Sequence, residues 1–155
     1  MQPDPDNFRL SSGQPYIKLH GSCNWSTGAG DPVLIMGDRK AINIGQFPIL
    51  SWYHDQLKSF LLRPNSRLMV IGYSFSDKHI NDAIGKGVEN GLKIFIIDPL
   101  GVDVLDKRQK EPVGRVPDEY MEKLKPHIIG ASRRPISSIF NEDKVEHARV
   151  TKFFS

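Results

Sequence analysis

The clearest hydrophobic pattern in the chain lies between residues 47 and 61. Apolar residues recur there at spacings of three and four positions: Ile49, Leu50, Tyr53, Leu57, Phe60 and Leu61. Such spacing places apolar side chains on one face of a helix, and Pro64 followed by Asn65 is a typical helix stop. We therefore predict an amphipathic helix that begins near Phe47 and ends before Pro64.

Two uninterrupted apolar runs, RLMVIG at 67–72 and KIFIIDP at 93–99, flank a second helical pattern. Apolar positions within 80–88 repeat every four residues, and Gly91 supplies a typical helix end. Strands without polar alternation that are joined by a helix are expected in a parallel sheet covered on both faces. The pattern predicts the α/β class, with a partial Rossmann-like parallel sheet and flanking helices.

The segments before this region carry weaker patterns. Residues 1–15 contain three prolines and are expected to form an extended lead-in. YIKLH at 16–20 predicts a short strand that ends at His20. The glycine and proline content of 26–32 indicates a loop, and 33–36 predicts another short strand.

The segments after the second apolar run are less regular. The stretch 117–126 predicts a helix closed by its final proline, and 127–130 predicts a last short strand. We expect a terminal helix over 141–154. Its inward positions are predicted to be Val145, Ala148 and Phe153.

Composition limits the classes of protein to consider. With 155 residues, of which 39% are apolar, the chain is long enough to bury a core and fits one ordinary domain. The net charge of +3 arises from 21 basic and 18 acidic residues, an excess too small to favour nucleic acid as a partner. The single cysteine excludes an internal disulfide. Because no signal peptide or long apolar run is present, we expect a cytoplasmic protein without membrane association.

Polar side chains gather where the first apolar run meets its helix. IGYSFSDKHIND at 71–82 places Gly72, Ser74, Ser76 and Asp77 at this junction. In parallel sheets ligands lie beyond the carboxyl ends of the strands, and a helix start there offers backbone N–H groups to phosphate. The serines can donate to phosphate or ribose oxygens, and Asp77 can accept from a ribose hydroxyl. Helix capping and turn formation explain the same residues without a ligand.

Two further residues are candidates for the same chemistry. Asp98 ends the second apolar run, where an acidic residue commonly meets a ribose diol, although it could instead only begin a turn with Pro99. His20 precedes Gly21, which leaves space for the imidazole to take a proton from a ribose hydroxyl or a water. A structural role for His20 is the alternative. No histidine stands at a metal-ligand spacing from Cys23 or from another histidine, so we predict no metal site.

Three motifs, taken in order, resemble the sirtuin superfamily and more closely its prokaryotic SIR2-like domains: KLHGS at 18–22, VIGYSFSD at 70–77 and FIIDP at 95–99. By this resemblance His20 is the catalytic histidine, and Asp98 contacts the adenosine ribose of NAD. The candidate residues for the NAD site are Gly21, Ser22, Gly72, Tyr73, Ser74, Ser76, Asp77 and Asp98. The tail IIGASRRPISSIF looks like the late family segment near the adenine, and its weaker candidates are Gly130 and Ser132.

The chain also departs from the family pattern. Deacylase sirtuins insert a zinc module with two cysteine pairs after the His-Gly motif, whereas this interval holds only Cys23. The chain therefore resembles the zinc-free branch, whose members are often NAD hydrolases in bacterial antiphage defence. The family's glycine-rich phosphate loop and its Asn-x-Asp segment, both upstream of the histidine, have no match here, because GAGDP at 28–32 lies downstream. We expect 16–155 to be the C-terminal portion of such a domain, inactive alone.

The leading hypothesis is a SIR2-like module that consumes NAD, with His20 activating a ribose hydroxyl or a water. A non-catalytic module that binds a nucleotide such as ADP-ribose, or that assembles with other chains, is the alternative. An NAD-dependent protein deacylase ranks lower because the zinc module is missing. A bare sheet edge would also favour a homo-oligomer or a companion chain.

Overall fold

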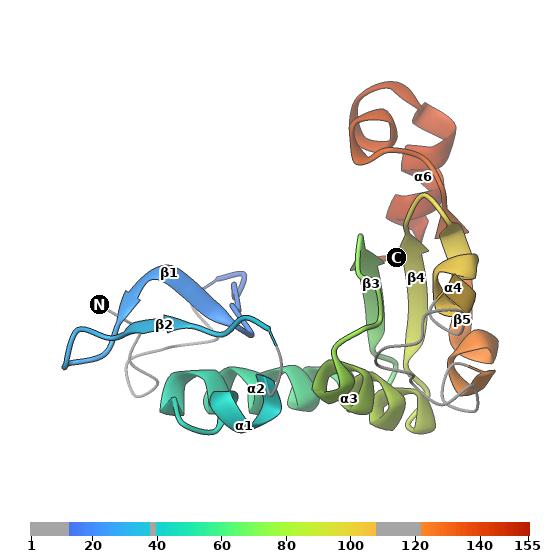
Figure 1. Cartoon of the computed structure of the whole chain (residues 1–155). Coiled ribbons are helices and arrows are strands. Elements are labelled where there is room, and N and C mark those ends of the chain that lie inside the picture. The colour runs from blue at the N-terminus through green and yellow to red at the C-terminus, as the bar shows by residue number, and fades with distance from the viewer. Residues whose placement is uncertain (1–12, 38–39, 108–121) are drawn as a thin grey trace. The chain divides into compact units, whose positions relative to one another are not determined.

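A computed structural model of the chain describes residues 13–37, 40–107 and 122–155 (Figure 1). The chain divides into two units, Met1–Ser59 and Phe60–Ser155, and each contains its own hydrophobic cluster. Within the described ranges, no helix combines the length and the apolar character that crossing a membrane requires.

The first unit is built on a β-hairpin. β1 (Gly21–Ser26) pairs antiparallel with β2 (Pro32–Leu34), and the helices α1 (Lys40–Ile44) and α2 (Pro48–Leu61) follow. The hairpin connection is the predicted loop, and the predicted amphipathic helix is α2, so both predictions are confirmed. The core of this unit consists of Trp25, Val33, Ile35, Ile44, Ile49, Leu50 and Tyr53. The short helix α1 was not predicted from the pattern.

The strand predicted over 16–20 is wrong, because the chain turns there and the strand begins only at Gly21. Gly21 closes the turn by donating its N–H to the carbonyl of Lys18 at 3.1 Å. Ile17 and Leu19 nevertheless pack against the core of the first unit. Their inward packing explains why the apolar alternation resembled that of a strand.

The second unit is built on a three-stranded parallel sheet. Its strands are β3 (Arg67–Ile71), β4 (Lys93–Ile97) and β5 (Ile128–Ser132), in the spatial order β3-β4-β5. Helix α3 (Lys78–Glu89) connects β3 to β4 (Figure 1). The α/β class with a partial Rossmann-like parallel sheet and flanking helices is therefore confirmed.

Short helical segments follow β4 and β5. After β4 come η3 (Gly101–Asp103) and α4 (Val104–Lys107), and η5 (Lys125–His127) leads into β5. After β5 come the π-helical turn η6 (Ser138–Glu142) and α6 (Lys144–Lys152). The prediction for 1–15 falls mostly outside the described residues. The first half of the helix predicted over 117–126 also falls outside the described residues. The part that is described is helical and runs into η5.

The inward face of α6 differs from the prediction. Val145 is 80% exposed and Ala148 is also exposed, so neither belongs to the core, whereas Phe153 is buried as predicted. Val150 is fully buried, and it joins Phe153 and Ile139 of η6 against the sheet residues Phe95, Ile97 and Met69. Val150 and Phe153, three positions apart, lie on the inward face of α6, whereas Val145 and Ala148 lie on an exposed face.

Candidate functional site

The turn that carries His20 requires glycine at the next position. Gly21 has a φ of +81°, and a Cβ at this position would lie 2.0 Å from the carbonyl oxygen of Val33. The carbonyl of His20 accepts the N–H of Ile35 at 2.9 Å, which ties the turn to the end of β2. Any side chain at position 21 would push the hairpin apart and displace His20. The glycine therefore serves the backbone geometry on which the histidine depends.

A second histidine lies near the first within this unit. His54 of α2 is buried, and the centroids of the His20 and His54 rings are 6.3 Å apart. The Nε2 of His54 lies 2.9 Å from the carbonyl oxygen of Leu19. Burial lowers the pKa of His54, the Leu19 carbonyl opposes that shift, and the nearby His20 adds to it. The sequence pattern marked His54 only as a helix residue, since thirty-five positions separate it from Leu19.

Ser22 belongs to a short polar chain on the hairpin. The Nζ of Lys18 donates to the Ser22 hydroxyl at 2.8 Å, and that hydroxyl donates to Oδ1 of Asn24 at 2.7 Å. The hydroxyl of Ser22 is thus held in place by its neighbours, half-buried beside the turn. These contacts place His20, Gly21 and Ser22 at one end of the hairpin.

The second group of candidates forms the loop between β3 and α3. Gly72 has a φ of +60°, and its N–H donates to the carbonyl of Ile97 at 3.0 Å, so the loop starts as an extension of the sheet. Ser74 and Ser76 are hydrogen-bonded to each other, with 2.8 Å between their hydroxyl oxygens. Asp77 is the N-cap residue of α3, and within the described chain its side chain forms no capping hydrogen bond. Helix capping by the Asp77 carboxylate therefore does not account for this residue.

Asn81 fixes this loop, although the sequence pattern did not single it out. Its side chain is 1% exposed; its Nδ2 donates to the carbonyl of Phe75 at 2.8 Å, and its Oδ1 accepts the Tyr73 hydroxyl at 2.9 Å. Phe75 has a φ of +54° and a ring that is 1% exposed. A left-handed conformation costs energy for a non-glycine residue, and a buried amide bonded to its carbonyl helps to hold it. The Asn81 contacts hold the loop in one conformation while Gly72 and Ser74 stay exposed.

Asp98 forms a turn at the end of β4. Its Oδ1 accepts the N–H of Leu100 at 2.8 Å, and its own N–H donates to the carbonyl of Ser132 at 3.0 Å. The local turn that was one of the two alternatives is therefore present. Because β3 and β4 are parallel neighbours, Asp98 and the Gly72 loop lie at the same edge of the sheet.

This carboxyl edge also contains a hollow with a volume of about 590 Å³. The residues that line it end β5, follow β4 or β5, or belong to α6, and they include Gly101, Ser132, Arg133, Arg134, Glu146 and Arg149. All three arginines are paired: Arg133 with Asp103 at 2.7 Å, Arg134 with Asp143 at 3.8 Å and Arg149 with Glu146 at 3.3 Å. The Ser132 hydroxyl accepts the N–H of Arg134 at 3.2 Å. Ser132 thus lines a hollow at the same edge as Asp98.

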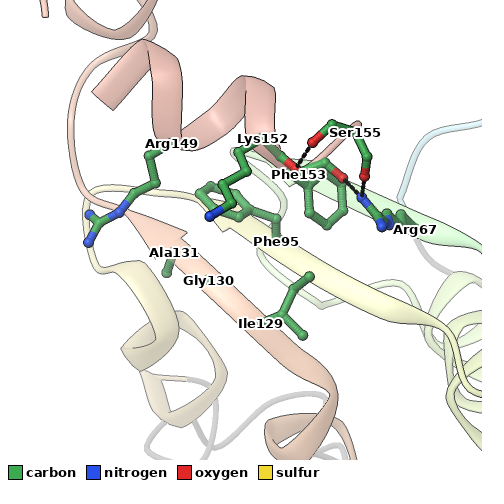
Figure 2. A pocket seen from close by; sticks show the side chains of 9 residues that line it. All are labelled: Arg67, Phe95, Ile129, Gly130, Ala131, Arg149, Lys152, Phe153 and Ser155. Atoms are coloured by element: carbon green, nitrogen blue, oxygen red, sulfur yellow. Dashed lines mark hydrogen bonds between the residues drawn. The ribbon is translucent and has the colours of Figure 1, made fainter. Parts of the chain in front are cut away.

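Gly130 occupies a different environment. A Cβ at this position would lie 2.6 Å from the ring of Phe95, so glycine is required for packing. Figure 2 shows a second hollow, of about 540 Å³, beside this contact and under α6. Arg67 borders that hollow and donates to the carbonyl oxygens of Phe153 and Ser155. The structure gives Gly130 a packing role in the sheet.

The candidate residues thus fall into two groups, each defined within its own unit. The first unit holds His20, Gly21 and Ser22 at the end of the hairpin next to His54. In the second unit one loop carries five candidates, and the neighbouring strand ends at Asp98. Those five are Gly72, Tyr73, Ser74, Ser76 and Asp77.

Comparison with known families found one match. A family model described as the SIR2-like domain matches residues 4–112, which is more than half of the chain. The matched region includes His20, the Gly72 loop and Asp98, whereas β5 lies outside it. A search of curated proteins found no match to the chain.

Proposed function

Because the chain belongs to the SIR2-like domain family, we propose that it binds NAD and hydrolyses the bond between nicotinamide and ribose. The observation that carries the proposal is the Gly72 loop, which Asn81 holds in one conformation at the carboxyl edge of a parallel sheet. That edge is where nucleotides bind in open α/β folds. The family supports an NAD-related fold. The hydrolase activity is our proposal for this chain, and it replaces the expectation, drawn from the missing phosphate loop, that the chain is inactive alone.

The residues of the second unit fit a nucleotide by their chemistry. The hydroxyls of Ser74 and Ser76 can donate to phosphate or ribose oxygens, and the exposed backbone at Gly72 permits close approach. Asp98 uses Oδ1 for the Leu100 N–H, and a carboxylate retains further acceptor positions for a ribose hydroxyl. The hollow of about 590 Å³ beside Asp98 is within the size range of small-molecule sites. We assign the adenosine side of NAD to this edge.

His20 would perform the proton transfer. In hydrolysis, the bond between the ribose carbon and the nicotinamide nitrogen breaks, and a bond from that carbon to a water oxygen forms. The His20 imidazole accepts the proton that this water loses, and it later returns the proton to solvent. An imidazole suits this role because its ordinary pKa lies near neutral pH.

Two measurements on the full chain test the proposal. Nicotinamide release from NAD should be abolished by His20→Ala. Calorimetry should detect binding of NAD and of ADP-ribose to the unmodified chain and to His20→Ala alike. Ser74→Ala should weaken binding of both ligands without changing the fold. Release that is unchanged in His20→Ala would refute the catalytic role. Binding without any release by the unmodified chain would instead favour the non-catalytic nucleotide-binding module.

We also include antiphage defence in the proposal, because NAD hydrolysis would deplete the NAD of an infected cell. Bacteria that express the chain should then survive phage exposure as a culture better than bacteria that express His20→Ala. Equal survival at equal protein levels would remove this biological role and leave the enzymatic proposal standing.

A further inference from the structure

The histidine of α2 contacts the peptide that carries the candidate catalytic residue. His54 is 7% exposed, and its Nε2 lies 2.9 Å from the carbonyl oxygen of Leu19, the residue directly before His20. A carbonyl oxygen only accepts hydrogen bonds, so Nε2 of His54 must carry a proton and donate it. Helix α2 is anchored in the core of the first unit through Ile49, Leu50 and Tyr53. The hydrogen bond therefore connects a fixed helix to the turn.

Three contacts then fix the turn on either side of His20. His54 holds the carbonyl of the preceding residue, Gly21 donates to Lys18 at 3.1 Å, and the His20 carbonyl accepts the N–H of Ile35 at 2.9 Å. The contacts to Lys18 and Ile35 depend only on backbone atoms, whereas the contact to Leu19 depends on a side chain. Substitution of His54 can therefore remove one anchor and leave the others in place.

The charges around His54 favour a neutral ring. The groups that act on it are His20, Lys58 and Asp55, and burial is the largest influence and lowers its pKa. The effects of Lys58 and His20 also lower the pKa, while Asp55 and the Leu19 carbonyl raise it. A neutral His54 can keep its proton on Nε2, where the Leu19 carbonyl accepts it.

We infer that His54 is a positioning residue for His20: it holds the Leu19 peptide, and through it the backbone of His20, against helix α2. The inference rests on the proposed function for its catalytic consequence, but its structural part can be tested without catalysis. A displacement of a general base by about 1 Å can cost a hundredfold in rate, so a fixed backbone at this position matters for proton transfer.

Two variants separate the hydrogen bond from simple packing. His54→Gln keeps a neutral side chain whose amide can donate to the Leu19 carbonyl, whereas His54→Leu fills the space without a donor. In His54→Leu, the Gly21 amide, which closes the turn, should exchange with solvent at least about tenfold faster, as expected when about 1.4 kcal/mol of local protection is lost. His54→Gln should restore the slow exchange. His147→Leu, which removes an exposed histidine from α6, is the control and should change nothing.

The exchange of amides in the middle of α2 shows whether the unit stays folded. If those amides keep their protection in His54→Leu while the Gly21 amide loses it, the effect is local to the turn. Equal exchange of the Gly21 amide in all variants would overturn the inference. The inference would also be overturned if the amides throughout α2 lost protection in both His54→Leu and His54→Gln. The role of His54 would then be packing alone.

Titration of the two rings by NMR supplies an independent readout. The ring centroids are 6.3 Å apart, so a positive charge on one ring disfavours a positive charge on the other. His20→Asn should therefore raise the pKa of His54. An unchanged His54 titration would contradict the proximity on which the inference depends.

The activity measurement links the inference to the proposed function. If the chain releases nicotinamide, His54→Leu should lower kcat by about tenfold or more with little change in KM, and His54→Gln should recover most of it. If the chain releases no nicotinamide, the proposed hydrolase function fails, yet the exchange and titration results still decide the positioning role. If the Gly21 amide of His54→Leu exchanges faster as expected but kcat equals that of the unmodified chain, only the catalytic consequence is refuted.

Discussion

Removal of the Asn81 side chain is the sharpest test of how the Gly72 loop is held. This amide is 1% exposed and contacts the loop twice, at the carbonyl of Phe75 (2.8 Å) and at the hydroxyl of Tyr73 (2.9 Å). Asn81→Ala deletes both hydrogen bonds and leaves the Phe75 carbonyl without this donor. Because Phe75 has a φ of +54°, the freed loop can also relax out of its left-handed conformation.

The expected magnitude follows from these contacts. A hydrogen bond contributes about 0.5–1.5 kcal/mol net, and a buried carbonyl left without a donor costs about 1–3 kcal/mol. We therefore expect Asn81→Ala to lower the free energy of unfolding of the second unit by roughly 2–4 kcal/mol. Tyr73→Phe removes the hydroxyl, which lies 2.9 Å from Oδ1 of Asn81 and 3.3 Å from the carbonyl oxygen of Asp77, so it should cost about 0.5–1.5 kcal/mol.

The choice of probe matters because both tryptophans, Trp25 and Trp52, lie in the first unit. Urea unfolding of the second unit should therefore be followed by circular dichroism, to which α3 and α6 contribute. Calorimetry with ADP-ribose should be performed on the same samples, since a loosened loop should bind the nucleotide more weakly than the native loop does.

The result that refutes the reasoning is a stability loss below about 0.5 kcal/mol for Asn81→Ala, which is the range of ordinary surface substitutions. A loss no larger than that of Tyr73→Phe would show that the bond to the Phe75 carbonyl contributes nothing. Unchanged ADP-ribose binding together with the full loss of stability would separate the loop from the nucleotide site. The loop would then be structural only.

Three further predictions concern packing and charge. Gly130→Ala should destabilise the second unit by about 1–3 kcal/mol, because the new methyl group would lie 2.6 Å from a buried ring, whereas Gly28→Ala meets no atom within 4 Å and should be neutral. Val150→Ala should cost about 1–3 kcal/mol by thermal unfolding, whereas Val145→Ala, at an 80% exposed position, should change little. Burial lowers the pKa of His54, so the unfolded chain takes up the proton first as pH falls below the ordinary value of 6.5. Tryptophan fluorescence should show the first unit losing stability as the pH falls below about 6.5, and His54→Gln should reduce this loss.

The parallel sheet could be predicted because its signal is local and strong. A parallel strand covered on both faces is apolar throughout. The four buried residues of β4 fit this rule, and β3, which buries only Val70, carries a similar uninterrupted run. The helix between them fixes the order of the two strands. The predicted edge of the sheet, with the Gly72 loop and Asp98 on it, followed from this order alone.

The turn at His20 could not be predicted from the same signal. Alternating apolar residues indicate which side chains face a core, but they do not show whether the backbone has a strand partner. In this chain Ile17 and Leu19 face the core from a segment that ends in a turn, and pairing starts at Gly21. The informative feature was the glycine itself, whose φ of +81° and contact with the Val33 carbonyl permit no side chain. The error on α6 has a different origin, because the spacing of apolar residues does not show whether the side with Val145 or the side with Val150 faces the sheet.

The two residues that support the candidate groups, Asn81 and His54, were also beyond the sequence pattern. Each acts through a hydrogen bond to a main-chain carbonyl, and such a bond depends on folding geometry and leaves no periodic trace. A polar residue at an inward helix position is nevertheless a usable signal. Asn81 lies directly after Ile80, the first residue of the apolar series at 80–88, and it is buried in α3. A buried amide there needs hydrogen-bond partners, which the neighbouring loop supplies.

A local structural role and a ligand role are not exclusive at the carboxyl edge. Asp98 engages one carboxylate oxygen with the N–H of Leu100, which fixes the direction of the other oxygen. Ser74 and Ser76 bond to each other, so one hydroxyl of the pair donates its proton and the other keeps a proton for a further acceptor. A turn that fixes its own polar side chains is better prepared for a ligand than a free one, because less conformational entropy is lost on binding. The turn that Asp98 forms therefore does not exclude the nucleotide hypothesis, and ligand binding measured on Ser74 and Asp98 variants tests that hypothesis directly.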